Sequence, residues 1–241
     1  MNLIPASSLN PSSIYCVGKN YLRHAKEMLQ WESNDENIKR STKKPEEPII
    51  FLKPATALSR NGKVRVPHFH GKPISKNLHY EAELVVLISK DAENIPTENT
   101  MSFIGGYGIG LDMTLRDVQM DAKEKGEPWL KCKGFKSSAL VSDMVPATHI
   151  LSPETLVFSL SLNDAIVQKG KAETMLFNIP ELISYLSYIY GLQAGDLLFT
   201  GTPEGVGKVN NGDMLHAELL QNNCCRDFTL LTSLDAVVEA V

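Results

Sequence analysis

The sequence has no CxxC pair, no excess of positive charge and no long apolar run, and each absence excludes a class of protein. Without CxxC spacing, and with Cys224 and Cys225 adjacent, the four cysteines favour a reduced, cytoplasmic protein over a disulfide scaffold. The net charge of −4 gives no reason to expect a nucleic-acid partner. No apolar run approaches the roughly 20 residues that span a bilayer. The N-terminus lacks a basic start and an apolar stretch, so we expect no secretory signal.

The composition is that of an ordinary globular protein, with 43% of the 241 residues hydrophobic and 22% charged. Strand-like runs separated by turn residues recur at 13–17, 48–52, 63–66, 80–88, 103–113, 155–162, 196–200, 214–219 and 228–232. Helical patterns occur at 20–30, 114–126 and 179–191. Because strands outnumber helices and do not alternate with them regularly, the pattern predicts a β-rich α+β fold rather than a doubly wound sheet.

One segment, 31–48, is almost wholly polar, with mixed charges and two prolines. Such a composition cannot form a core, so the segment is either the tip of a lid or an idle surface loop. Its place directly after the expected helix at 20–30 favours a lid made of that helix and loop, at about 20–48.

Two glutamates, Glu81 and Glu83, interrupt the apolar run LHYEAELVVLI at 78–88. On a strand their side chains point to the same face, where two like charges beside an apolar run repel each other. A hard divalent cation such as Mg²⁺ or Mn²⁺ would neutralise that repulsion. Asp112, at the end of the glycine-rich run GYGIGLD, is the candidate third ligand. The alternatives are a solvated face of an edge strand for the glutamates and a helix cap for Asp112.

Further polar residues follow Asp112. Arg116 and Gln119 are spaced to share a helix face, where Arg116 could bind a carboxylate or form a surface ion pair with Asp117 or Asp121. Lys133 is directed either into a site or along the surface.

The glycine-rich stretch TGTPEGVGK at 200–208 fails as a phosphate-binding loop, because its glycine spacing is one residue too long and Val209 replaces the required Ser or Thr. Its backbone amides and Thr202 could still bind a carboxylate.

Several ordered motifs resemble the fumarylacetoacetate hydrolase family, most closely its short, single-domain acylpyruvase-like branch: GKNYLRHAKEM, FLKPATAL, HYEAELVVLI, GYGIGLDMTLRDVQ, KGFKSS and LQAGDLLFTGTPEGVG. The resemblance covers nearly the whole chain. It implies a mixed β-sandwich roll in one catalytic domain, a homodimer, and Mg²⁺ or Mn²⁺ held by Glu81, Glu83 and Asp112.

The resemblance also implies roles for other residues. Arg116, Gln119 and Thr202 match substrate-binding positions, and Lys133 matches a lysine that polarises the substrate oxygens. His24 and Glu27 match a catalytic histidine–glutamate dyad on the lid helix. Their i, i+3 spacing places both side chains on one helix face, where the carboxylate can orient the imidazole. Without the resemblance, an ordinary exposed helix pair is the alternative.

The expected activity is Mg²⁺-dependent hydrolysis of acylpyruvate-type 2,4-dioxo acids. A metal-stabilised pyruvate enolate would form as the C–C bond breaks, with His24 and Glu27 activating water. The main alternative is a decarboxylase, isomerase or tautomerase acting on oxaloacetate or on 2-oxo diacids of aromatic catabolism. A metal-binding protein without turnover is the third possibility.

Overall fold

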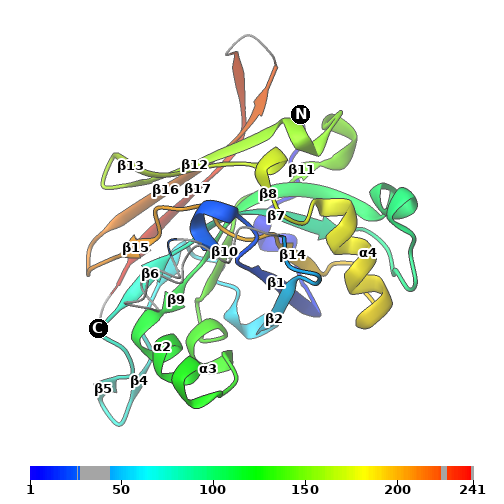
Figure 1. The fold of residues 1–241 in the computed structure, drawn as a ribbon. Helices are drawn as coiled ribbons and strands as arrows, with labels where there is room; N and C mark the ends of the chain where they lie inside the picture. The colour runs from blue at the N-terminus through cyan, green and yellow to red at the C-terminus, as the bar shows by residue number, and fades with distance from the viewer. Residues whose placement is uncertain (26, 28–43, 224–226, 240–241) are drawn as a thin grey trace.

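The computed structural model describes residues 1–25, 27, 44–223 and 227–239, and Figure 1 shows how their elements are arranged. Most of the polar segment predicted to form a lid tip, from 31 to 43, lies outside the described residues, as does the adjacent cysteine pair. Of the helix predicted at 20–30, residues 22–25 and 27 are helical, and the remainder beyond 27 is likewise outside the described part.

A seven-stranded sheet forms the centre of the molecule, in the order β10-β8-β7-β14-β1-β2, with β11 pairing with β8. Strand β1 runs parallel to β14, and the other neighbours are antiparallel. The strands are β1 (Ser13–Gly18), β2 (Ile49–Pro54), β7 (Ala82–Ile88), β8 (Ile104–Asp112), β10 (Ala139–Val141), β11 (Val145–Pro146) and β14 (Leu197–Phe199).

Apolar side chains of β7 alternate between the two faces of this sheet. Leu84 and Val86 join the main core, whereas Val85 and Leu87 join a second core on the opposite face. Because both faces are covered, all seven residues of β7 are buried, which explains why its sequence reads as a continuous apolar run.

A five-stranded sheet, in the order β13-β12-β16-β17-β3, lies against the first across the main core. Its strands are β3 (Lys63–Val64), β12 (Leu156–Leu162), β13 (Ala165–Lys171), β16 (Met214–Asn222) and β17 (Phe228–Val238). The hairpin from β12 to β13 turns at Asn163 and Asp164, whose φ angles of 48° and 68° are those of a type I′ turn. The hairpin of β16 and β17 extends beyond the body of the molecule (Figure 1).

The run 78–88 is two strands rather than the single strand predicted. Strand β6 (Leu78–Tyr80) belongs to a small sheet with β15 (Gly207–Lys208) and β9 (Thr114–Leu115), whereas β7 belongs to the central sheet. Glu81 lies at the change from one sheet to the other. A two-stranded ribbon of β4 (His68–Phe69) and β5 (Lys72–Pro73) completes the strands.

Besides the helical residues 22–25 and 27, the described helices are α2 (Arg116–Lys125), α3 (Leu130–Lys133) and α4 (Ile179–Ile189), with α4 on one flank of the central strands and α2 and α3 near their other end (Figure 1). Helix α4 begins with a capping box formed by Asn178 and Glu181, and Pro180 occupies its first turn. Short 3₁₀ turns occur at Ala6–Ser8, Ala55–Ala57, Thr97–Phe103, Ala147–His149, Pro153–Thr155 and Ala172–Thr174. Within the described residues, no helix is long and apolar enough to cross a membrane. The strand-rich α+β class predicted from the sequence is confirmed.

Candidate metal centre and active site

Three carboxylates converge where the small sheet that contains β6 meets the central sheet. Glu81 lies at the change of sheet, Glu83 lies on β7 opposite Gly110, and Asp112 ends β8. The backbone N–H of Asp112 donates to the Glu81 carbonyl over 2.8 Å, which holds the two strand ends together. Each of the three residues offers a carboxylate oxygen within 4.8 Å of those of the others, and all three are buried. Oxygen donors of this kind suit a hard divalent cation.

Positive charges surround two of these carboxylates. Lys133 Nζ, at the end of α3, lies 2.6 Å from Glu81 and 2.7 Å from Asp112. Arg116, at the start of α2, pairs with the other Glu81 oxygen over 2.5 Å. Burial acts to raise the pKa of Glu81, but these two cations outweigh it and hold that pKa below its ordinary value. Glu81 is therefore ionised before any metal arrives.

Lys53, from β2, is the third buried cation. Its Nζ lies 2.7 Å from Asp112 Oδ1, and it donates to the carbonyl oxygens of Met113 and Lys133. The contact with Asp112 is an ion pair whose angles are not those of a hydrogen bond. The Lys53 side chain is 0% exposed. Lys53 thus ties Asp112 to the backbone of α3.

Glu83 differs from its two neighbours. It accepts a hydrogen bond from the backbone N–H of Gly201 over 2.7 Å, and no lysine or arginine pairs with it in the described part of the chain. Burial and the nearby negative charges of Asp112 and Glu81 raise the pKa of Glu83 well above its ordinary value. A cation held by the three carboxylates would favour the ionised form of Glu83, so the donor set fits a divalent metal.

The structural alternatives for these residues do not hold. Glu83 is on β7, which lies between β8 and β14, and Glu81 lies between β7 and β6, which is itself the middle strand of its sheet, so neither glutamate is on an edge strand. Helix α2 begins after Leu115 with no side-chain cap, so Asp112 does not cap it. Arg116 and Lys133 are each 3% exposed and contact Glu81, so neither forms a surface pair or lies along the surface.

His24 and Glu27 lie beside this cluster. His24 is 4% exposed, and its Nδ1 lies 3.3 Å from Glu27 Oε2. Both Glu27 oxygens accept from the backbone N–H of Gly205, each over 3.3 Å. The pair is therefore held against the loop at 201–205, and it is not an ordinary exposed helix pair.

One cavity brings most of the predicted site residues together. It is lined by His24, Glu81, Glu83, Arg116, Gln119, Lys133 and Thr202, among others. Two of the predicted residues, Glu27 and Asp112, do not line the cavity, but each is hydrogen-bonded to a residue that does. Gln119 accepts from Arg116 through Oε1, which leaves its Nε2 hydrogens as donors.

Three buried polar residues of the site were missed in the sequence. Lys53 is described above. Asn20 donates to the Thr200 and Phe177 carbonyls and accepts from the Phe177 N–H, so it fixes the start of the helix that carries His24. Gln168, on β13, contacts the loop that holds Thr202. Asn20 precedes a helix, and Lys53 and Gln168 are single polar residues in strands, so no local pattern of the sequence marks any of the three.

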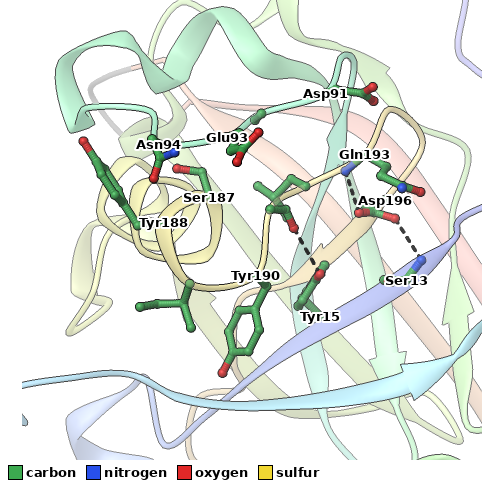
Figure 2. A pocket seen from close by; sticks show the side chains of 14 residues that line it. Ser13, Tyr15, Asp91, Glu93, Asn94, Ser187, Tyr188, Tyr190, Gln193 and Asp196 are labelled. Carbon is green, nitrogen blue, oxygen red and sulfur yellow. Dashed lines mark hydrogen bonds between the residues drawn. The ribbon is translucent and has the colours of Figure 1, made fainter.

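A separate cavity of about 700 Å³ lies between the end of α4, the start of β1 and the loop after β7 (Figure 2). Several of its polar groups are bonded within the fold. Asp196 accepts from the backbone N–H groups of Ser13 and Gln193, and Tyr15 donates to the Gly191 carbonyl. The convergent charges of the molecule lie at the carboxylate cluster instead.

Comparison with known proteins agrees with this geometry. The family model of the fumarylacetoacetate hydrolase C-terminal domain matches residues 13–237. The chain belongs to the fumarylacetoacetate hydrolase family, and its strand-rich α+β fold is that of this family's C-terminal domain. It is an enzyme of that family with a metal-binding acidic triad.

Relatives with assigned activities are similar over most of the chain. The mitochondrial oxaloacetate tautomerase FAHD1 of Mus musculus is 44% identical over 206 residues, which is 85% of this chain and 86% of that protein. The Homo sapiens protein of the same name is 40% identical over 85% and 86% of the two chains. The structure of fumarylpyruvate hydrolase from Pseudomonas aeruginosa, in complex with Mn²⁺ and pyruvate, has a TM-score of 0.77 at 32% identity. It covers 100% of this chain and 96% of its own.

Proposed function

We propose that the protein is a divalent-metal enzyme for small 2-oxo acids and that its main reaction is the keto–enol interconversion of oxaloacetate. The observation that carries the proposal is one cavity lined by two carboxylates of the triad, by a buried arginine and lysine, and by the histidine of the His24–Glu27 pair. The relatives named oxaloacetate tautomerase, at 40–44% identity over 85% of the chain, support the choice of substrate.

In this proposal Glu81, Glu83 and Asp112 hold Mg²⁺ or Mn²⁺. The bound ion would act as a Lewis acid toward the 2-oxo and carboxylate oxygens, which makes the neighbouring carbon more acidic. The buried cations hold the carboxylates of Glu81 and Asp112 in place, so the chain is organised for the ion in advance.

His24 is the proposed base. With the proton of Nδ1 directed at Glu27, the lone pair of Nε2 is available to take a proton from the carbon next to the 2-oxo group. Transfer of a proton from solvent to the enolate oxygen completes the enol, and in the reverse direction the oxygen loses that proton and Nε2 returns one to carbon. Gly205 fixes Glu27 and so fixes the orientation of the imidazole.

Lys133 acts through its charge. An ammonium group has three hydrogens, and Nζ already donates to Glu81, Asp112 and Thr114 over 2.6–2.7 Å. Lys133 therefore stabilises negative charge on the substrate oxygen at short range without a direct hydrogen bond. Arg116, the Nε2 group of Gln119 and Thr202 are the proposed binding groups for the substrate carboxylates.

Hydrolysis of acylpyruvates, the reaction expected from the sequence, is the second candidate. The P. aeruginosa hydrolase structure, which contains Mn²⁺ and pyruvate, favours it. In that reaction the same His24–Glu27 pair would deprotonate a water molecule that attacks the distant carbonyl, and pyruvate and a carboxylic acid would leave.

The domain organisation, the oligomeric state and the cellular compartment are also proposals. We propose one catalytic domain over 1–241, with a lid at about 20–48, and a homodimer, which light scattering of the purified chain would test. We propose a reducing compartment such as the cytoplasm, since Cys16 and Cys132 are free and buried. The mammalian relatives carry a mitochondrial location in their names.

The test is a substrate panel on the purified protein. We expect the protein with Mg²⁺ to accelerate loss of the ultraviolet absorbance of oxaloacetate enol, and a chelator to abolish the acceleration. Acetylpyruvate and fumarylpyruvate, followed by pyruvate release, test the second candidate in parallel. If the protein with Mg²⁺ turns over neither oxaloacetate nor the two acylpyruvates, the proposal is overturned.

A further inference from the structure

The side-chain amide of Gln168 connects three separate parts of the site. Gln168 lies on β13 of the five-stranded sheet and is 2% exposed. Its Oε1 accepts from the backbone N–H of Ala82, the residue between the two glutamates, over 2.9 Å. Its Nε2 donates to Thr202 Oγ1 over 2.9 Å and to the Pro203 carbonyl over 3.0 Å. The amide oxygen and the amide nitrogen therefore both have hydrogen-bond partners inside the protein.

The two backbone partners determine which way the amide points. The Ala82 N–H can only donate and the Pro203 carbonyl can only accept, so oxygen and nitrogen cannot exchange places without losing both bonds. Thr202 therefore receives a hydrogen from Gln168 and keeps its own hydroxyl hydrogen for another acceptor. No acceptor for that hydrogen occurs among the residues that the structure describes, and Thr202 lines the cavity of the site.

The local backbone explains how a strand residue reaches this place. The pairing of β12 with β13 skips Val167, so a β-bulge immediately precedes Gln168 and redirects its side chain. The loop after Thr202 lies directly on the bulge: a Cβ at Gly205 would stand 2.3 Å from the Val167 carbonyl oxygen, and the φ of Gly205 is +92°. The same Gly205 donates to Glu27.

We propose that Gln168 is a positioning residue that fixes the Thr202 hydroxyl as a hydrogen-bond donor to a carboxylate oxygen of the bound 2-oxo acid. This inference rests on the proposed function. It makes Gln168 a determinant of carboxylate recognition, since a Thr202 hydroxyl that accepts from Gln168 directs its own hydrogen to another acceptor, such as a carboxylate oxygen.

The test measures pyruvate binding by calorimetry to the full chain loaded with Mg²⁺. The variants are Gln168→Met, which keeps the volume and removes the side-chain hydrogen bonds, Thr202→Val, and the two combined. Gln221→Met makes the same substitution elsewhere in the five-stranded sheet and is the matched control. A hydrogen bond to a charged group accounts for roughly a tenfold to hundredfold change in affinity. We therefore expect each single variant to bind pyruvate at least about tenfold more weakly, and the double variant no more weakly than the worse single.

A purely structural role predicts that the losses of pyruvate affinity add up in the double variant. It also predicts that turnover of the 2-oxo acid substrate shows an unchanged KM and a reduced kcat in Gln168→Met. Either result overturns the inference. Wild-type affinity for pyruvate in Gln168→Met overturns it too. Gln168→Glu guards against misfolding of the methionine variant, because its carboxylate still accepts from Ala82 but cannot donate to Thr202. We expect it to lose pyruvate binding as Thr202→Val does, and retained binding would overturn the inference. If the wild type itself binds no pyruvate with Mg²⁺, the proposed function fails and the inference fails with it.

Discussion

Replacing Lys53 with methionine tests how the buried charges of the site are balanced. The substitution removes an ammonium that is 0% exposed and lies 2.7 Å from Asp112, and it keeps nearly the same volume. Removing one partner of a buried ion pair typically costs about 3–5 kcal/mol, because the other charge is left without compensation.

The magnitude falls at the lower end of that range for a structural reason. Asp112 retains Lys133 on its other oxygen at 2.7 Å, and the Lys133 carbonyl retains the hydroxyl of Ser138 as a donor. We therefore expect a loss of about 3 kcal/mol in the free energy of unfolding. For a chain of this size that corresponds to a fall in Tm of about 6–12 °C.

Urea unfolding of the metal-free protein measures the change, with the exposed Lys136→Met as the matched control, for which we expect less than about 0.5 kcal/mol. Adding Asp112→Asn to Lys53→Met should recover part of the loss, since it removes the uncompensated charge. A Lys53→Met variant within about 1 kcal/mol of the wild type would show that the cluster does not depend on this cation.

Three further predictions concern separate groups. Glu83→Gln should weaken Mg²⁺ binding by more than about 100-fold, beyond the loss typical for residues outside the ligand set, without lowering the stability of the metal-free protein; unchanged calorimetric affinity would remove Glu83 from the ligands. His24→Ala should reduce acylpyruvate cleavage and oxaloacetate tautomerisation by about 10²–10⁴-fold while sparing oxaloacetate decarboxylation, and equal losses of kcat/KM in all three would mean that His24 only shapes the site. The hydrogen bond to Asp235, 2.7 Å away, raises the pKa of His216, so this pair stabilises the fold below the unfolded pKa of about 6.5 and loses its effect as pH rises through the folded value. An NMR titration should show that pKa returning toward its ordinary value in Asp235→Asn, and no change would exclude the bond in solution.

The sequence predicts those parts of the fold that depend on local pattern. The alternation and length of the apolar runs place β7, β8 and β14, and the Asn178 cap and Pro180 place α4. The break at Glu81 was missed, because the period of two continues across it and nothing local shows that the chain changes sheets there. Strand β13 was missed because its exposed, polar sequence AIVQKGK lacks an apolar face.

The site is predictable only where its residues form a pattern. Two glutamates on one strand face are visible in the sequence, since burial of like charges needs a reason. Lys53 and Gln168 are not visible in this way, because each is one polar residue in a strand, where a solvent-facing position is the ordinary expectation. Their importance comes from tertiary contacts, with the Asp112 carboxylate in one case and with the Ala82 backbone and Thr202 in the other.

The three carboxylates differ in the positive charges that pair with them, and therefore in what each contributes. Lys53, Arg116 and Lys133 all pair with Glu81 or Asp112, so the protein itself fixes the positions of these two carboxylates. Glu83 has one backbone amide instead, and burial beside the other two raises its pKa. The gain from binding a cation is therefore concentrated at Glu83, whereas the stability of the metal-free fold depends on the cations around the other two. For this reason Lys53→Met should change mainly the unfolding free energy, and Glu83→Gln mainly the affinity for the metal.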